Sequence, residues 1–450
     1  MNRRATRLSA VALAIVLVAA CSSDKKTSAG SGASSGSSAS SSSSAAYTVD
    51  TSKCGTDPTK KITGTVKIGA TMPLSGGAAA AAFAPVAAGF KAYIDYANAQ
   101  NLLPGYTVQL SIEDDQYKSD LTTPAVEKLL DQTGVDIFAG IIGTPNNGAV
   151  RDTLNQECVP QLSALSGSPA WGDAAHFPWT IGGLPPYNVE AQIYAANVKT
   201  DFPKGAKAAI FRVNNEFGQI YEDSFKADAK DAGVTIVDTQ TIEATDSAPP
   251  TPQITSIASK APDVIIAAPL GAQCITFLKE IANAKAQNPA FNPRVYITNT
   301  CSSSLLIGLA GEAADGVYTT AALKDVNDPA NASDPAVVLL KGELTKAAFP
   351  ATGDYGTAAA GWGVGEVTLK ALIAASKSPD GLTRKSILEA ARTLDYSPPL
   401  NRKGIDYKLN GTTDPFAIES LQVIQYQFAT KTYKDIGPVI SQFEGKTKSS

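Results

Sequence analysis

The feature that most constrains the fold is an alternation of short β-branched runs with stretches of helical spacing. Four runs occupy the first half of the body and four the second: 64–70, 106–112, 135–140 and 158–163, then 207–213, 234–239, 262–268 and 294–299. Apolar residues at helical spacing occupy 86–99 and 124–133 between them. Strands joined by helices run parallel and are buried on both faces, so the pattern predicts parallel sheets flanked by helices. Two successive runs of four strands predict two α/β lobes.

Small polar residues follow three strands of the first predicted lobe, in the loops 72–77, 141–147 and 163–168. In open α/β sheets, ligands bind beyond the carboxyl ends of the strands, where helix N-termini offer free N–H groups. The alternative is that these residues only cap helices and form turns. The candidate ligand-binding residues in these loops are Ser75, Thr144, Asn146, Ser163 and Ser166.

The amino terminus has the pattern of an export signal. Residues 1–20 contain three arginines followed by an apolar stretch too short to cross a bilayer stably, and they end in two alanines. Cys21 follows at once, as in a bacterial lipobox, which predicts a lipid on its sulfur and a location on the extracytoplasmic face of the cell membrane. The alternative is an ordinary signal peptide with a chance cysteine.

A serine-rich segment separates Cys21 from the body. Residues 28–44 contain only Ser, Gly and Ala, so they cannot bury enough apolar area to offset the entropy of ordering them. We therefore expect a disordered tether over residues 21–50. A Gly/Ser chain of about 25 residues spans roughly 25–30 Å.

Cysteine usage predicts two disulfides in an exported protein. Four cysteines remain after Cys21: Cys54, Cys158, Cys274 and Cys301. Four cysteines allow three pairings, and their order along the chain favours Cys54 with Cys158 and Cys274 with Cys301. A metal site is the alternative, but His176 is the only histidine and no C-x-x-C spacing occurs.

Composition and motifs argue against nucleic-acid binding and catalysis. The net charge is −4 without a basic stripe, and no G-x-S-x-G, P-loop or strand-following G-x-G-x-x-G occurs. The glycines of GWGVGE (361–366) fit close packing of a helix better than phosphate binding. His176 fits a loop or core position. Asp114 and Asp115 could act as an acid/base pair but are better explained as caps of turns and helices. We therefore expect no enzyme activity, no cofactor and no metal.

Six segments resemble, in order and spacing, the branched-chain amino-acid (Leu/Ile/Val) binding proteins of bacterial ABC importers. They are GATMPLSGGAAAAAFAPVAAGFKAYIDYANAQ, IEDDQY, CVPQLSALSGSP, NNEFGQIYEDSFKADAKDAGV, PDVIIAA and AGEAADGVY. The resemblance covers about residues 62–440. It implies the type I periplasmic binding fold, in which two Rossmann-like lobes are joined by three hinge crossovers. The implied lobes are 62–183 plus 322–398 and 184–321 plus 399–440.

The resemblance also implies ligand contacts. It places hydroxyl and N–H groups for a ligand carboxylate at Thr144 with Pro145 and at residues 165–167, an aromatic ring at Phe217, and a second aromatic position at Leu270. The acidic residue that binds the ligand's ammonium falls at Asn299, and a neutral amide cannot supply that charge-assisted bond. This departure predicts a ligand without an ammonium group. The alternative is that Glu216, Asp114 or Asp115 restores a carboxylate. The full predicted set is Ser75, Thr144, Asn146, Ser163, Ser166, Phe217, Leu270 and Asn299.

The function implied by the resemblance is capture of a small organic solute. We expect an extracytoplasmic solute-binding lipoprotein, monomeric and lipid-anchored, that closes its two lobes on the solute and delivers it to an ABC permease in the membrane. The alternative is a ligand sensor that signals to a membrane receptor through the same closure, because hinge closure around a ligand serves either role.

The lipobox generates a direct prediction. Replacing Cys21 by Ser removes the only thiol that could take the lipid, so the Cys21→Ser variant should be released or stalled during export. Fractionation of cells expressing either protein checks this. Wild-type amounts of correctly processed variant in the membrane would exclude lipidation at this position.

Overall fold

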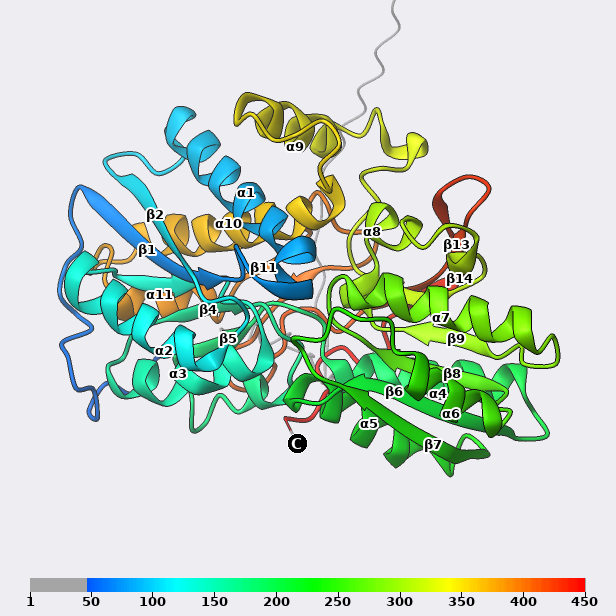
Figure 1. The fold of residues 1–450 in the computed structure, drawn as a ribbon. Helices are drawn as coiled ribbons and strands as arrows, with labels where there is room; N and C mark the ends of the chain where they lie inside the picture. Colours follow the sequence, from blue (N-terminus) through cyan, green and yellow to red (C-terminus); the bar gives the residue numbers. More distant parts are fainter. Residues whose placement is uncertain (1–46, 450) are drawn as a thin grey trace, which may run out of the picture. The chain divides into compact units, whose positions relative to one another are not determined.

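A computed structural model describes residues 47–449, and it contains two separate main sheets (Figure 1). The first has five parallel strands in the order β2-β1-β3-β4-β5. β3 is its central strand and is fully buried, and in the neighbouring β1 seven of the eight residues are wholly or partly shielded from solvent. Its strands are β1 (Thr65–Met72), β2 (Thr107–Asp114), β3 (Ile137–Ala139), β4 (Gln161–Ala164) and β5 (Thr180–Gly182).

The second sheet has seven strands in the order β14-β13-β10-β9-β8-β6-β7. Five are parallel, and β13 and β14 add an antiparallel edge. The strands are β6 (Ala206–Val213), β7 (Val234–Ile242), β8 (Val264–Ala268), β9 (Arg294–Ile297), β10 (Tyr318–Ala321), β13 (Leu421–Gln427) and β14 (Thr432–Ile440). The eight strands predicted from the sequence are β1 to β4 and β6 to β9, whereas β5, β10, β13 and β14 were not predicted. A two-stranded ribbon is formed by β11 (Asp395–Tyr396) and β12 (Tyr407–Lys408).

Helices connect the strands and cover the sheets (Figure 1). They are α1 (Gly77–Ala99), α2 (Ser119–Lys128), α3 (Thr144–Gln156), α4 (Tyr187–Asp201), α5 (Glu216–Ala229), α6 (Thr251–Ser259), α7 (Gln273–Gln287), α8 (Ser304–Gly308), α9 (Pro335–Lys346), α10 (Tyr355–Ser376) and α11 (Arg384–Ala391). The two helical stretches predicted from the sequence fall in α1 and in α2 with the π-helical turn that follows it, Leu129–Thr133. Sheets with helices on their faces confirm the predicted α/β class.

The chain passes between the two sheets three times. It leaves the first sheet after β5 and returns from the second sheet after β10. The return is shown by α10, which follows β10 in the chain and packs against α1 of the first sheet's side. It enters the second sheet again at β13. All strands of the first sheet lie between residues 65 and 182, and those of the second between 206 and 440. The exact lobe boundaries expected from the resemblance stay a prediction.

The start of the described chain corrects one expectation. The predicted signal peptide, Cys21 and most of the predicted tether lie outside the described residues. Val49, however, is buried, and its N–H donates to Glu389 Oε1 at 3.0 Å. The prediction that the disordered tether extends to residue 50 is therefore wrong at its last residues. Tyr47 and Val49 carry apolar side chains that can pack on the body, unlike the Ser, Gly and Ala residues before them.

Both predicted disulfides are present. Cys54 is bonded to Cys158, with Cα atoms 5.3 Å apart, and Cys274 to Cys301, with Cα atoms 6.0 Å apart. The first joins the segment before β1 to the turn between α3 and β4. The second joins the start of α7 to the segment after β9. Each restricts the unfolded chain, which stabilises a fold typically by about 2–4 kcal/mol.

The long apolar helix α1 packs against α10 (Figure 1), and at two glycines the backbones of the two helices are in direct contact. Among the described helices it is the one whose length and composition would allow it to cross a membrane, but a helix buried in a protein core meets the same criteria. A Cβ atom on Gly361 would lie 1.9 Å from the carbonyl oxygen of Val86, and one on Gly89 would lie 1.8 Å from that of Ala358. Glycine at these two positions therefore allows the helices to touch.

This contact predicts opposite effects for two glycines of α10. Gly361→Ala should destabilise the fold by about 1–3 kcal/mol or more, because the new methyl group overlaps the backbone of α1. Gly363→Ala is the matched control, since nothing lies within 4 Å of its Cβ position. It should be neutral or stabilising by up to about 1 kcal/mol through helix propensity. Urea unfolding of both variants measures this, and equal stabilities would contradict the packing described.

Candidate functional site

A cavity of about 190 Å³ lies at the carboxyl ends of strands from both sheets. Its walls come from segments that directly follow β3, β4 and β5 of the first sheet and β6, β8, β9 and β10 of the second. The wall is completed by the second and third turns of α1, the first two turns of α10, and Tyr117, Arg402, Ile424 and Tyr433. Ligands of open α/β sheets bind at this edge. The cavity is therefore the candidate functional site.

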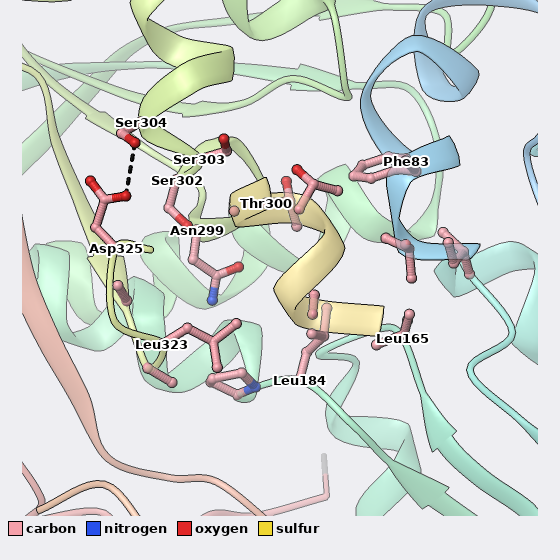
Figure 2. A pocket seen from close by; sticks show the side chains of 18 of the residues that line it. Phe83, Leu165, Leu184, Asn299, Thr300, Ser302, Ser303, Ser304, Leu323 and Asp325 are labelled. Atoms are coloured by element: carbon pink, nitrogen blue, oxygen red, sulfur yellow. Dashed lines mark hydrogen bonds between the residues drawn. The ribbon is translucent and has the colours of Figure 1, made fainter. Parts of the chain in front are cut away.

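Apolar side chains make up most of the wall. Figure 2 shows Phe83, Leu165, Leu184 and Leu323 around the space, together with Asn299 and the hydroxyl residues that follow it. Such a surface favours the hydrocarbon part of an organic solute through the hydrophobic effect. The larger apolar members of the wall are Phe83, Val86, Ile142, Leu165, Leu184, Phe217, Leu270, Leu323 and Ile424.

Three residues of the predicted ligand-binding set line this cavity. Phe217 lies in the first turn of α5, which Asn215 caps by accepting the Gly218 N–H at 3.2 Å. Leu270 follows β8, and its N–H donates to Gln273 at 3.1 Å. Asn299 follows β9. All three stand on the second sheet's side of the cavity.

The hydroxyls of Thr144 and Ser166 do not reach the wall. Both residues are buried, and their oxygen atoms are hydrogen-bonded to each other at 2.8 Å. Tyr187 does line the cavity, and burial raises the pKa of its hydroxyl to about 12, while bonds with Ser166 and Thr144 act in the opposite direction. Thr144 and Ser166 therefore interact with the hydroxyl group of Tyr187, which lines the cavity, and do not line it themselves.

Ser75, Asn146 and Ser163 also lie away from the cavity wall. The Ser75 hydroxyl donates to Asp114, whose carboxylate also accepts the Leu74 N–H at 2.9 Å. Asn146 donates to Asp115 at 3.1 Å. Ser163 is buried. Ser75 and Asn146 thus bond with neighbouring carboxylates and have structural roles in their loops.

The carboxylates proposed as alternatives do not supply charge to the cavity. Asp114 and Asp115 hold the loops after β1 and β2, and neither they nor Glu216 line the wall. Three other charged residues do, namely Lys324, Asp325 and Arg402. The predicted set contains no charged residue, so these three were not among the residues expected at the site, and the set stays a prediction. These residues lie on segments that cross between the sheets, where no local motif marks them.

The residues considered for chemistry lie elsewhere. His176 is exposed and hydrogen-bonds Asp173 at 2.9 Å, outside the cavity. Four of the five cysteines are in disulfides. Within residues 47–449 no group of three or more His, Cys, Asp or Glu side chains could hold a metal ion.

A buried carboxyl group underlies the cavity. Glu190, in the first turn of α4, accepts hydrogen bonds from the hydroxyls of Tyr194 and Tyr221, from the Thr320 hydroxyl at 2.9 Å and from the Asn299 N–H at 2.8 Å. Burial raises the pKa of Glu190 to about 7, and these hydrogen bonds only partly oppose it. No sequence pattern distinguished this residue from a solvent-facing glutamate in the first turn of a helix.

The raised pKa predicts a specific pH dependence. The ordinary pKa of 4.5 in the unfolded chain lies below about 7 in the folded protein, so folding favours the protonated carboxyl. Its contribution to stability is complete below the lower value and is lost as the pH rises through the upper one. The stability of wild type relative to Glu190→Gln should therefore fall between about pH 5.5 and about pH 8.

Glu222→Gln provides the control for that measurement. Glu222 is paired with Arg212 and Lys226, and its pKa is lowered despite its partial burial. It is ionised throughout this pH range in both states, so its effect on stability should be constant. Urea unfolding at the two pH values measures both differences. A pH-independent effect at Glu190 would contradict the pKa shift.

Comparison with known proteins shows the family and the fold of the chain. A family model described as a periplasmic binding protein matches residues 65–427. No curated protein sequence matches the chain. A possible leucine/isoleucine/valine-binding protein from Rhodopirellula baltica SH 1 is 21% identical, with 83% of this chain and 96% of that chain covered and a TM-score of 0.68.

Two further structures share the fold at low sequence identity. A branched chain amino acid ABC transporter protein from Thermus thermophilus with bound valine is 17% identical, with 84% and 97% of the chains covered and a TM-score of 0.74. A solute binding protein of an ABC transporter from R. palustris, in complex with 4-hydroxybenzoate, is 18% identical, with 84% and 97% covered and a TM-score of 0.69. With the matching family model and the parallel sheets, these likenesses show that the chain belongs to the periplasmic binding proteins and has their type I fold.

Proposed function

We propose that the protein is a lipid-anchored, extracytoplasmic solute-binding protein that captures one small organic molecule and delivers it to an ABC permease. The observation that carries the proposal is the apolar cavity between the carboxyl ends of the two sheets. Relatives of the same fold hold compact organic molecules, valine in one case and 4-hydroxybenzoate in another. We propose that this chain uses its cavity in the same way, as a monomer and without catalysis.

The size of the cavity limits the solute. An engineered apolar cavity of about 150 Å³ takes up benzene. At about 190 Å³, this cavity fits a solute of similar bulk with a short substituent. We propose that Phe217 and Leu270 contact the hydrocarbon part of the solute and that Asn299 bonds its polar part. The anchor at Cys21 and the serine-rich tether would keep the body near its permease.

Ligand screening tests the proposal. We expect at least one small organic solute to raise the melting temperature of the full-length protein in mild detergent, because a ligand that binds only the folded state adds RT ln(1 + [L]/Kd) to its stability. Leu323→Ala removes part of the cavity wall and should reduce the shift. Leu309→Ala is the control, since Leu309 is 58% exposed and outside the wall.

Two results would count against this function. One is the failure of every solute in a broad organic library to shift the melting temperature. The other is equal loss of binding in both leucine variants. Uptake of the identified solute by cells with and without the protein then tests delivery, because a sensor would leave uptake unchanged.

A further inference from the structure

One end of the cavity has polar groups with unused hydrogen-bonding capacity. Oδ1 of Asp325 accepts the Ser304 hydroxyl at 2.9 Å, the bond drawn in Figure 2, and the Asn327 N–H at 3.0 Å. Oδ2 of Asp325 is buried and has no partner among the described residues. Tyr433, only 8% exposed, also lines the cavity, and its hydroxyl likewise has no partner among them.

Two unpaired polar atoms in one cavity wall require an explanation. Buried polar atoms are almost always hydrogen-bonded, because leaving one unpaired forfeits its hydration without replacement. Burial raises the pKa of Tyr433, and the charge of Asp325 raises it further. Among the residues of the wall, Asp325 and Tyr433 are the two with a buried side-chain oxygen atom that has no partner among the described residues.

Asp325 has no direct ion-pair partner among the described residues; burial raises its pKa, and the charge of Arg402 only partly opposes that rise. Lys324 donates to Asp334 at 2.7 Å and to the Pro399 carbonyl at 2.8 Å. Arg402 donates to Asp435 at 2.6 Å and to the Leu323 carbonyl at 3.1 Å. Asp325 forms no ion pair with any described residue. The wall thus has one unpaired carboxyl group and, among the described residues, no unpaired basic group.

The same wall offers little to a carboxylate ligand. The two basic residues are already neutralised, and the Thr144 and Ser166 hydroxyls are bonded to each other behind the wall. A buried carboxylate without a basic partner is strongly unfavourable. The ligand that best matches the charges of this wall is therefore an apolar molecule with a positively charged nitrogen and no acid group.

We propose that Asp325, assisted by the Tyr433 hydroxyl, binds the protonated amino group of a primary amine whose hydrocarbon body fills the apolar part of the cavity. The inference rests on the proposed function and names its solute class. It revises the expectation of a ligand without an ammonium group. That expectation followed from the neutral amide of Asn299. The carboxyl group in the wall belongs to Asp325, which lies in a different segment of the chain.

Two sets of matched probes test the proposal by calorimetry on the full-length protein. Isopentylamine, leucine and isocaproate share one branched body, and phenethylamine, phenylalanine and hydrocinnamate share one aromatic body. Within each set the first has only the amine, the second has both groups, and the third has only the acid. We expect an amine to bind at least about tenfold more tightly than its amino acid and its acid.

Variants test the assigned residue. Asp325→Asn keeps the shape of the side chain and an oxygen that can accept the Ser304 and Asn327 bonds, so the fold should be retained. It should weaken amine binding at least about tenfold, because the charge-assisted bond is lost. Asp152→Asn, at a side chain that is 71% exposed and outside the cavity wall, is the control and should leave affinity unchanged. Tyr433→Phe should weaken amine binding to a smaller extent.

The outcomes separate this inference from the proposed function. Tight binding of isocaproate, hydrocinnamate or a neutral solute, with no binding across linear, branched and aromatic primary amines, overturns the inference and leaves solute capture intact. Amine binding that survives Asp325→Asn also overturns it. If no organic solute binds at all, both proposals fall.

Discussion

The cavity depends on a carboxyl group buried without a counter-ion. Removing Glu190 from water is costly, and four hydrogen bonds from α4, α5, β10 and the segment after β9 offset that cost. One of the donors is the N–H of Asn299, a residue of the cavity wall. The position of the wall is therefore set by the same bonds that satisfy Glu190. Tyr221 is the sole donor to one carboxyl oxygen, so its loss would leave that oxygen unpaired, whereas the other oxygen is shared by Tyr194, Thr320 and Asn299.

The regular part of the fold follows from local sequence patterns. Eight strands could be predicted because β-branched runs alternate with helical spacing, and Gly361 could be read as a packing residue because it stands in a helix-like stretch without the spacing of a phosphate-binding loop. β5, β10, β13 and β14 could not. β5 has only three residues, β13 pairs with β10 from a distant part of the chain, and β13 and β14 form a local hairpin. These strands do not alternate with helical stretches in the way that the eight predicted strands do.

The site was predictable only where it follows directly from strand ends. Phe217, Leu270 and Asn299 line the cavity because each comes just after a strand of the second sheet. Thr144 and Ser166 come after strands as well, but each satisfies the other's hydroxyl. A sequence shows which polar groups are near a strand end, not which of them bond with each other. Asp325 and Arg402 lie in crossover segments, so their meeting at one cavity is a property of the tertiary structure.

The arrangement of the wall also orders the steps of capture. Asp325 and Arg402 lie on segments that cross between the sheets, whereas Tyr433 lies in β14, and the surroundings of a hinge segment change least when lobes move. Phe83 belongs to the first sheet's side and Leu270 to the second, so a solute touches both only when the lobes are together. The head group would therefore be recognised first, by groups present in the open and the closed forms. Burial of the hydrocarbon body then supplies free energy only to the closed form, which is the differential affinity that drives closure.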